Sequence, residues 1–594
     1  MKNVTPRKMR RHAKRIVTVP DLLADRLKRL PNSPVLYEPE PLGDGWRPLT
    51  MRDLDSRIRK IARGLIGMGF QRGDAIGIMG ATSLEWCLLD LACALSGLVV
   101  VPIYQTDSAS QLEWILEDAN VRGVFVDTAD RRELVSSKAT DQVIVMLDAE
   151  GLSQVETHAT AVTEDDLDAR IRGISGDTLY SIVYTSGTTG RPKGVELTHS
   201  NFTYICLGAR EWSPRLVMNP QTRLLQFLPL AHVMGRIITL ICIGGSAQVA
   251  FAPNIHNLTH DLHMFQPTLL VVVPRVLEKV YNAAEAKAGA GLGRRIFKWA
   301  ASVAERNSQK HFHGPLFRLE RRLADRLVLS KIRYAVGGKV SGIISAGAPL
   351  GNDLSHFYGG IGMPVTEIYG LTETLGSGTV QDWGKAVPGN LGRTFPGTRV
   401  RIAEDGEIQI KGPGVFRRYH NNAEATAAAF EDGWFLSGDL GSVNKNGALE
   451  IIGRKKHLIV TAGGKNVAPD VLQDALASHP LISQIMVIGD RKPFIAALIT
   501  LDAQLLPGWL RAHKLPPMST AEARVHPAVL ASLQRGIDRA NAHVSRAESI
   551  RKFEVLPGDF TEENGMLTPS MKVRREVVLK NFADVVDRIY AAKK

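Results

Sequence analysis

The chain has 594 residues, of which 44% are hydrophobic and 22% are charged, as in proteins that fold in water. This length exceeds what one ordinary core needs, so we expect two or more domains. The formal net charge of +13 favours anionic partners. Aromatic residues reach only 6% and the signatures of nucleic-acid-binding modules do not occur, so we expect no nucleic-acid partner.

The cysteines and the apolar stretches bear on location. The sequence has four cysteines without a CxxC pair or other metal-ligand spacing, which supports neither a disulfide framework nor a zinc site. The sequence shows no secretory signal, and its apolar runs are interrupted or too short to cross a bilayer. We therefore expect a cytoplasmic protein, with peripheral attachment to the inner face of a membrane as the sharper alternative.

The first 30 residues are strongly basic. Residues 1–30 carry ten Lys or Arg and two Asp. We expect a solvated basic extension here, and attachment to a membrane surface is again the alternative.

Helical and strand patterns alternate after this extension. Apolar residues recur at helical spacing from Leu54 to Met68 and again near Leu84 to Leu95. Short apolar runs, which predict strands, lie between and after them at 75–79, 99–102 and 124–126. This alternation predicts parallel sheets covered by helices on both faces.

A loop rich in glycine and hydroxyl groups follows the apolar run that ends at Val183. Its sequence from Tyr184 to Gly194 is Tyr-Thr-Ser-Gly-Thr-Thr-Gly-Arg-Pro-Lys-Gly. Glycines let backbone N–H groups turn toward an anion, hydroxyl groups add donors, and Lys193 adds a positive charge. The loop is not a Walker A motif, because Gly194 follows the lysine. It suits a polyphosphate.

Further motifs follow in a fixed order. They are 227–233 with His232, 274–282, 345–349, 369–373 (Tyr-Gly-Leu-Thr-Glu), 432–439 with Asp439, 453–456, 461–466 and 567–575 with Lys572. Together with the loop at 184–194, these motifs resemble the adenylate-forming (AMP-dependent synthetase/ligase) superfamily. The run at 274–282 is similar to one in long-chain fatty-acyl-CoA synthetases.

The resemblance implies an α/β fold. We expect a large N-terminal domain with parallel αβ sheets and a small β-barrel part, followed by a mobile C-terminal α+β domain. The implied boundaries are 1–30 for the extension, 31–453 for the AMP-binding domain, and 454–594 for the hinge and C-terminal domain. One helix is expected over 577–589.

The resemblance also implies residue roles. Lys572 would complete adenylation, His232 would lie where the acid and adenylate pockets meet, and Lys456 would be the hinge. Thr185 and Glu373 would act in catalysis and hold Mg²⁺. Nucleotide or coenzyme A binding is implied for Thr185, Ser186, Gly187, Thr188, Thr189, Gly190, Lys193, Gly347, Ala348, Pro349, Tyr369, Gly370, Thr372, Asp439, Arg454 and Gly464. The chain departs from the family at one point, because Lys572 follows Ser570-Met571 where relatives commonly have Ser-Gly.

The implied activity uses ATP, Mg²⁺ and coenzyme A. A long-chain fatty acid would form acyl-AMP with release of pyrophosphate, and coenzyme A would then displace AMP. Two alternatives remain: a fatty acyl-AMP ligase that passes the acyl group to a carrier protein, and a catalytically silent lipid-binding protein of the same fold. Acyl chain length and oligomeric state do not follow from the residues.

A second basic stretch lies in the middle of the chain. Residues 293–333 contain eleven Lys or Arg and three acidic residues, interleaved with large apolar side chains. We expect helices packed on the domain with solvated basic faces, and the alternative is a basic amphipathic surface that rests on anionic lipid.

Overall fold

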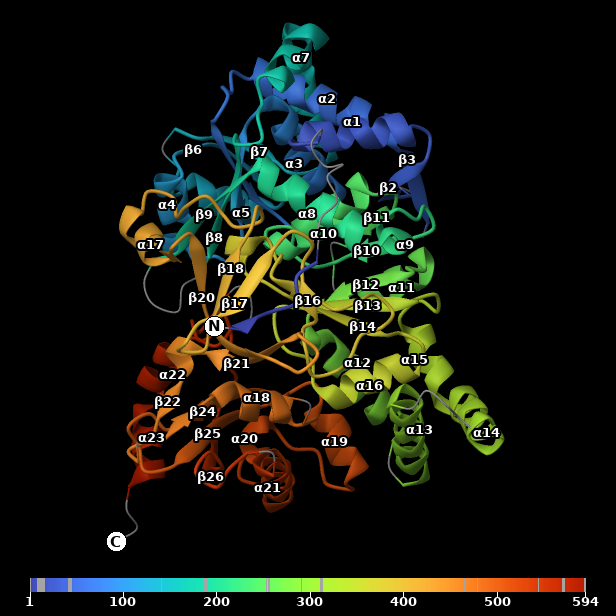
Figure 1. Ribbon diagram of the computed structural model, residues 1–594, viewed down its shortest axis with the longest axis vertical. Helices are drawn as coiled ribbons and strands as arrows, with labels where there is room; N and C mark the ends of the chain where they lie inside the picture. Colours follow the sequence, from blue (N-terminus) through green and yellow to red (C-terminus); the bar gives the residue numbers. More distant parts are fainter. Residues whose placement is uncertain are drawn as a thin grey trace.

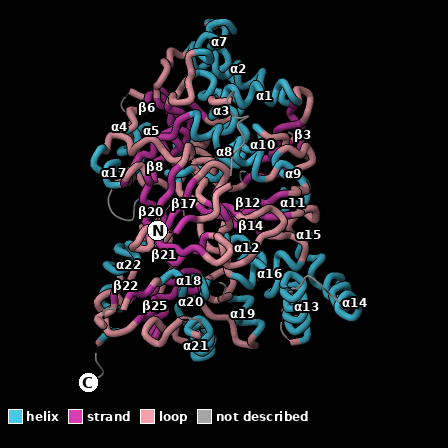
Figure 2. Tube along the Cα trace, viewed as in Figure 1, coloured by secondary structure: helices cyan, strands magenta, loops and turns pink. Residues whose placement is uncertain are grey.

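The chain forms a stack of sheets and helices, seen in Figure 1 with the N-terminal part above and the C-terminal part below. This computed structural model describes residues 2–7, 16–40, 45–139, 141–185, 191–252, 254, 257–289, 291–309, 314–463, 465–477, 479–542, 544–568 and 572–591. Figure 2 shows that strands fill the centre of the N-terminal part and that helices surround them. The α/β class that the sequence predicts is confirmed.

The first large sheet has six strands in the order β7-β6-β4-β5-β8-β9. Their bounds are β4 Ala75–Met79, β5 Val99–Ile103, β6 Val121–Val126, β7 Val143–Met146, β8 Leu179–Thr185 and β9 Lys193–Thr198. All neighbours are parallel except β8 and β9, which form an antiparallel pair around the glycine-rich loop. The loop therefore starts at the carboxyl end of a parallel strand.

The second large sheet has nine strands in the order β16-β15-β14-β13-β12-β10-β11-β2-β3. Their bounds are β2 Pro34–Pro39, β3 Trp46–Thr50, β10 Arg223–Gln226, β11 Gln248–Phe251, β12 Leu269–Val272, β13 Gly342–Ala346, β14 Val365–Tyr369, β15 Thr379–Val380 and β16 Arg393–Thr394. The strands from β2 to β14 run parallel, and antiparallel strands close both edges.

A smaller antiparallel sheet lies where the resemblance implies a barrel. It contains β1 Lys2–Asn3, β17 Arg399–Ile402, β18 Glu407–Lys411, β19 Phe430–Glu431, β20 Trp434–Val443 and β21 Leu449–Arg454. The first strand of the chain, β1, pairs with β17. The N-terminus therefore belongs to a sheet whose other strands come from much later in the sequence.

Helices pack on these sheets and between them. Their bounds are α1 Val19–Arg29, α2 Met51–Gly67, α3 Leu84–Ser96, α4 Ala109–Asp118, α5 Ala129–Ser136, α6 Ala149–Thr157, α7 Glu164–Arg172, α8 His199–Trp212, α9 Pro214–Val217, α10 Val233–Gly244, α11 Leu258–Phe265, α12 Pro274–Lys287, α13 Leu292–Gln309, α14 Pro315–Ala324, α15 Ser330–Ala335, α16 Asn352–Gly360 and α17 Ala423–Ala428. The helices α2 and α3 confirm the helical patterns in the sequence.

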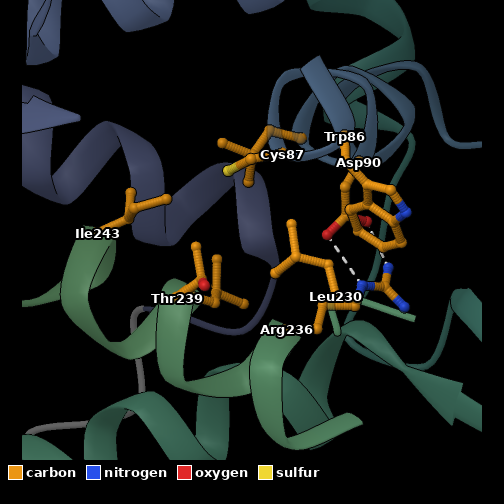
Figure 3. Close-up of a pocket in the computed structure, with 9 residues that line it drawn as sticks. Trp86, Cys87, Asp90, Leu230, Arg236, Thr239 and Ile243 are labelled. Atoms are coloured by element: carbon orange, nitrogen blue, oxygen red, sulfur yellow. Dashed lines mark hydrogen bonds and ion pairs between the residues drawn. The ribbon is translucent and has the colours of Figure 1, made fainter. Parts of the chain in front are cut away.

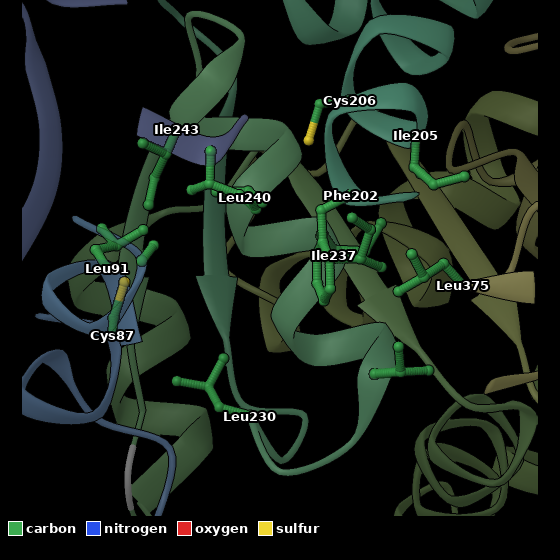
Figure 4. Close-up of a cluster of buried hydrophobic side chains, with 14 of the residues drawn as sticks. Cys87, Leu91, Phe202, Ile205, Cys206, Leu230, Ile237, Leu240, Ile243 and Leu375 are labelled. Carbon is green, nitrogen blue, oxygen red and sulfur yellow. The ribbon is translucent and has the colours of Figure 1, made fainter. Parts of the chain in front are cut away.

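The main core lies around α10, which packs between α3 and α8 (Figure 4). Leu240 and Ile243 of α10 face Cys87 and Leu91 of α3, and Phe202 of α8 lies on the other side. These side chains are almost fully buried, and each large one contributes roughly 1.5–3 kcal/mol relative to exposure. The apolar run that the sequence shows around α10 is therefore core.

The C-terminal part has its own core around a three-stranded sheet. The sheet contains β24 Ile482–Ile488, β25 Ile495–Leu501 and β26 Ile550–Val555, and a short pair contains β22 Ile459–Val460 and β23 Asn466–Val467. The helices are α18 Pro469–Ala477, α19 Leu506–Ala512, α20 Thr520–Ala523, α21 Pro527–Asn541, α22 Arg575–Asn581 and α23 Ala583–Tyr590. The single helix expected over 577–589 is thus two helices, which meet at Phe582. The exact domain boundaries stay a prediction.

The expectation of a solvated extension over 1–30 does not hold for the described residues. Leu22 and Leu23 of α1 are buried in the main core, and Arg26 is fully buried with its guanidinium donating to the Gly245 carbonyl (2.6 Å). The basic composition of residues 1–30 does not reveal that α1 is an amphipathic helix with one apolar face. Among the described residues, no helix is both long and apolar enough to cross a bilayer.

Candidate active site

Most of the predicted site residues lie at the carboxyl ends of parallel strands. His232 follows β10, Gly347 follows β13, and Tyr369 ends β14, all within the second sheet. Thr185 ends β8 of the first sheet. The Thr82 hydroxyl, after β4, donates to the Leu228 carbonyl (2.9 Å) and so joins the strand ends of the two sheets. Ligands commonly bind at such edges in α/β folds.

The base of the glycine-rich loop is well defined. Thr185 and Lys193 face each other across β8 and β9, and the Thr185 hydroxyl donates to the Lys193 carbonyl (3.4 Å). The Lys193 ammonium lies over the ring of Tyr419, 5.1 Å from its centroid. The predicted residues Ser186, Gly187, Thr188, Thr189 and Gly190 lie outside the described residues.

Tyr419 links this loop to Glu373. Its hydroxyl donates to Glu373 Oε1 (2.9 Å), and its ring lies beneath Lys193. Glu373 lies in a short 3₁₀ turn, Thr372–Thr374, directly after β14. Thr372 shares this turn, and Gly370 precedes it with no space for a side chain, because a Cβ there would lie 2.3 Å from the Gly376 backbone. The proposed magnesium ligand and the loop lysine therefore share one neighbour.

The segment that carries Tyr419 is fastened to β9 by a buried carboxylate. Glu196, 1% exposed, pairs with Arg418 (2.9 Å) and with His420 Nδ1 (2.9 Å). These partners lower the pKa of Glu196 against the effect of burial, and Glu196 raises the pKa of His420. Sequence reasoning missed Tyr419 and Glu196, because the contacts that define them join residues more than 40 positions apart.

Asp439 and Arg454 face each other on β20 and β21. Arg454 Nε lies 2.8 Å from Asp439 Oδ1, and the Tyr369 hydroxyl donates to Asp439 Oδ2 (2.8 Å). Burial raises the pKa of Asp439, and the positive charge of Arg454 opposes this shift. The structure thus brings together three residues that the sequence predicts to contact the nucleoside.

Lys572 comes to this cluster from the C-terminal part of the chain. Burial and the positive charge of Arg454 lower its pKa, whereas the carboxylates of Asp439 and Glu373 act in the opposite direction. Such interactions reach about 10 Å at ordinary ionic strength. The residue as a whole is exposed. The catalytic role of Lys572 stays a prediction.

Lys572 also acts on His232. The His232 ring caps α10, where Nδ1 accepts from the Met234 backbone N–H (3.1 Å). Burial lowers its pKa to about 4, and the positive charge of Lys572 adds to this shift. His232 is therefore neutral at pH 7, and the charge of Lys572 acts both on it and on Asp439.

The predicted hinge residue lies between the two parts of the chain. Lys456 belongs to a 3₁₀ turn, Lys455–His457, between β21 and β22. Burial and Arg454 lower the pKa of Lys456, and Lys193 contributes in the same direction. The neighbouring Lys455 binds Asp405 (2.6 Å) and Glu407 (2.8 Å), which anchors the turn to the antiparallel sheet.

Two other predicted regions behave differently. Gly347, Ala348 and Pro349 form an exposed loop after β13, and Gly347 has φ +91°, which suits glycine. Gly464 lies outside the described residues, and its neighbours Ala462 and Lys465 contact Lys492 and Glu548 of the C-terminal part. In this arrangement the charges of Asp439 and Glu373 act on Lys572, and the flanks of the 461–466 loop contact other residues of the C-terminal part.

The run at 274–282 lies at the contact between the two parts of the chain. The Arg275 guanidinium donates to the carbonyls of Ala477, Ile482 and Ser483 and lies 3.5 Å from Asp502. Its described contacts therefore hold the C-terminal part in place.

A small cavity lies beside α10 (Figure 3). Its volume is about 10 Å³, and its lining includes Trp86, Leu91 and Leu240. Arg236 forms its polar wall: the guanidinium binds both oxygens of Asp90 (2.5 and 2.8 Å) and donates to Ser181 (2.5 Å). Space of this size holds about one water molecule.

Family models match almost the whole chain. Residues 23–420 match the model described as AMP-binding enzyme, and residues 456–594 match the AMP-binding enzyme C-terminal domain. The long-chain-fatty-acid--CoA ligase FadD15 of Mycobacterium tuberculosis is 44% identical over 557 residues, covering 92% of each chain. The long-chain-fatty-acid--CoA ligase ACSBG1 of Rattus norvegicus is 30% identical and covers 93% of this chain and 83% of its own.

A solved structure supports the fold. The crystal structure of the adenylation domain of a carboxylate reductase from Mycobacterium chelonae aligns with a TM-score of 0.73 at 20% identity, covering 98% of this chain and 94% of that one. The motifs in family order, the convergence of Lys572, Glu373 and Asp439, and these matches agree. The chain belongs to the adenylate-forming AMP-binding enzyme family, among relatives that are long-chain fatty acyl-CoA synthetases.

Proposed function

We propose that this protein activates a long-chain fatty acid as acyl-AMP and then transfers the acyl group to coenzyme A, releasing pyrophosphate and AMP. The observation that carries the proposal is the contact of Asp439 with Arg454 and with Tyr369, at a place where the charge of Lys572 also acts. The 44% identical relatives that are named long-chain-fatty-acid--CoA ligases support the substrate class.

In the first step the fatty acid carboxylate attacks the α-phosphorus of ATP, and the bond to pyrophosphate breaks. Lys193 and Lys572 stabilise the negative charge that develops on phosphate oxygens. Asp439 accepts hydrogen bonds from the ribose hydroxyls with Arg454 beside it, and Tyr369 and the loop from Gly347 to Pro349 border the base. The neutral His232 lies beside the carboxylate without adding charge.

Magnesium fits the donors at this place. The described residues contain no cluster of three His, Cys, Asp or Glu side chains that would form a complete metal cage. Mg²⁺ needs no such cage, since it commonly binds one or two carboxylates together with phosphates and water. Glu373 and Thr185 supply hard oxygen atoms. A chain of contacts connects the two residues: Glu373 accepts from Tyr419, the Tyr419 ring lies under Lys193, and the Lys193 carbonyl accepts from Thr185. When bound, the ion would neutralise phosphate charge, and Tyr419 would hold Glu373 in position for it.

In the second step the thiol of coenzyme A attacks the acyl carbon, and AMP leaves with the electron pair of the broken bond. We infer that the C-terminal part rotates about Lys456, which withdraws Lys572 and presents the loop around Gly464. Lys455, fixed by Asp405 and Glu407, gives the turn one anchored side. One site then serves two reactions in alternation.

The test is an assay of AMP release across saturated acids from short to very long, with and without coenzyme A. The proposal expects release that requires coenzyme A and is greatest for long chains. If preformed acyl-AMP is not consumed by free coenzyme A but is consumed by a carrier protein, the protein is an acyl-AMP ligase instead. The absence of ATP–pyrophosphate exchange with every acid would support the silent lipid-binding alternative and contradict the proposal.

A further inference from the structure

The helix α14 is apolar on two sides, although only one side packs on the protein. Its inner side holds the buried Ala324 and the partly buried Phe317 against the second core. Its outer side exposes Leu316, Leu319 and Leu323, which are 84%, 66% and 51% exposed. The stripe continues through Leu327, 41% exposed, on the following turn. A helix with two apolar sides needs a second apolar partner.

The hairpin that carries this stripe is fixed in place. The preceding helix α13 packs its buried Phe297, Ala300 and Val303 in the second core. Glu320 of α14 accepts from Trp299 (3.0 Å) and Arg306 (2.6 Å) of α13, which locks the two helices together. Figure 1 shows α13 and α14 projecting from the body of the molecule. Packing of Phe317 and Ala324, on a neighbouring side of the helix, therefore holds the leucines outward.

The charges around the stripe have one sign. Both acidic side chains of this segment are paired: Glu320 binds Arg306, and Asp325 binds Arg333 (2.6 Å). Five cations are left exposed, and no ion pair joins them to any described residue; they are Arg318, Arg321, Arg322, Arg326 and Lys331. An apolar stripe bordered by cations fits the interface of an anionic lipid bilayer, with leucines among acyl chains and arginines at phosphate groups.

We propose that the outer side of α14 and the turn after it form a surface that docks on an anionic lipid bilayer. From Pro315 to Ala335 the helical segment runs for about 30 Å at roughly 1.5 Å per residue, which is long enough to lie in the plane of the interface. The surface lies outside the proposed active site. Its binding can therefore be measured without ATP, fatty acid or coenzyme A, independently of the proposed ligase activity.

The experiment is cosedimentation of the full-length protein with vesicles of phosphatidylglycerol and phosphatidylcholine, against vesicles of phosphatidylcholine alone. The apolar variant is Leu319→Ser with Leu323→Ser, matched by Val387→Ser with Val525→Ser, two exposed residues elsewhere. The charge variant is Arg318→Gln, Arg322→Gln and Arg326→Gln, matched by Arg132→Gln, Arg172→Gln and Arg215→Gln, which are also exposed. Thermal unfolding of each variant checks that it is folded.

We expect binding to the anionic vesicles only. Each arginine removed from α14 and the turn after it should weaken this binding about fivefold, corresponding to about 1 kcal/mol per basic residue near an anionic surface. The leucine variant should also bind several-fold more weakly, and both matched controls should bind like the wild type. Failure of the wild type to bind, or equal binding by the α14 variants and their controls, would overturn the proposal. So would a concentration-dependent dimer that only the leucine variant abolishes, because a second copy would then cover the stripe.

Discussion

The buried pair of Arg236 and Asp90 and the more exposed charged groups around Lys572 differ in how their charges are arranged. Arg236 is 3% exposed, makes direct bonds to Asp90 and Ser181, and lies over the ring of Tyr180, 4.5 Å from its centroid. Lys572 has no direct ion pair with a described carboxylate. Charges of both signs from separate segments act on it instead.

The difference distinguishes a structural ion pair from a site prepared for a charged ligand. A buried pair whose hydrogen bonds are all made is satisfied within the protein and costs much to break. A cation such as Lys572, which makes no direct ion pair with a described carboxylate, favours an incoming anion, and burial lowers its pKa. We therefore expect substitutions in the first region to change stability and substitutions in the second to change activity.

The largest effect on stability is expected for Arg236→Met. This change leaves the Asp90 carboxylate buried without its cation, and should lower the unfolding free energy by about 3–5 kcal/mol. Chemical denaturation measures it. The double variant Asp90→Leu with Arg236→Met should recover most of the loss, since it removes both charges. A loss below about 1 kcal/mol in the single variant would show that the pair is not a structural one.

A smaller effect, on activity, is expected for Tyr419→Phe. The change removes one hydrogen bond to the Glu373 carboxylate and keeps the ring under Lys193. Hydrogen bonds to charged groups contribute about 1.5–3 kcal/mol, so ATP–pyrophosphate exchange should fall about tenfold or more. Thermal unfolding should stay near that of the wild type. In a background of Glu373→Gln the same change should cost much less, and full additivity would contradict the positioning role.

The stability of the folded protein should depend on pH through His232. The folded state holds the pKa of His232 at about 4, below the ordinary value of 6.5, so the unfolded state binds the proton more readily. Stability is therefore unaffected above pH 6.5 and falls as the pH decreases from 6.5 toward 4. The slope from one such group is at most about 1.4 kcal/mol per pH unit. His232→Asn should have a shallower slope than the wild type in chemical denaturation, and identical slopes would contradict the assigned shift.

The fold was largely predictable because its periodic elements are strongly patterned. Strand β4 and helix α2 follow directly from the apolar spacing of their residues, and the order of the motifs indicates the family. The helix α1 was not recognised, because its buried Arg26 and the basic residues before it looked like a solvated tail. The buried guanidinium of Arg26 donates to the carbonyl of Gly245, which lies more than 200 positions away in the sequence. Local composition cannot reveal this contact.

Motifs of a few residues predict roles for Glu373, Asp439 and Lys572, and these roles stay a prediction. The structure shows that the carboxylates of Asp439 and Glu373 both act on the pKa of Lys572. Tyr419 and Glu196 were missed because their roles come from pairing between β9 and a distant segment. The sequence predicts a basic amphipathic helix in the region of α14. It does not predict which apolar side of this helix remains exposed in the folded protein.

The central claim is that Lys572 serves adenylation at a site built by the N-terminal part of the chain. Its most direct test is Lys572→Ala, assayed separately for ATP–pyrophosphate exchange and for thioester formation from supplied acyl-AMP and coenzyme A. We predict that exchange falls by about 10²–10³-fold, as expected when one donor to a developing charge is lost, while thioester formation is retained. Equal loss of both half-reactions, or unchanged exchange, would contradict the account.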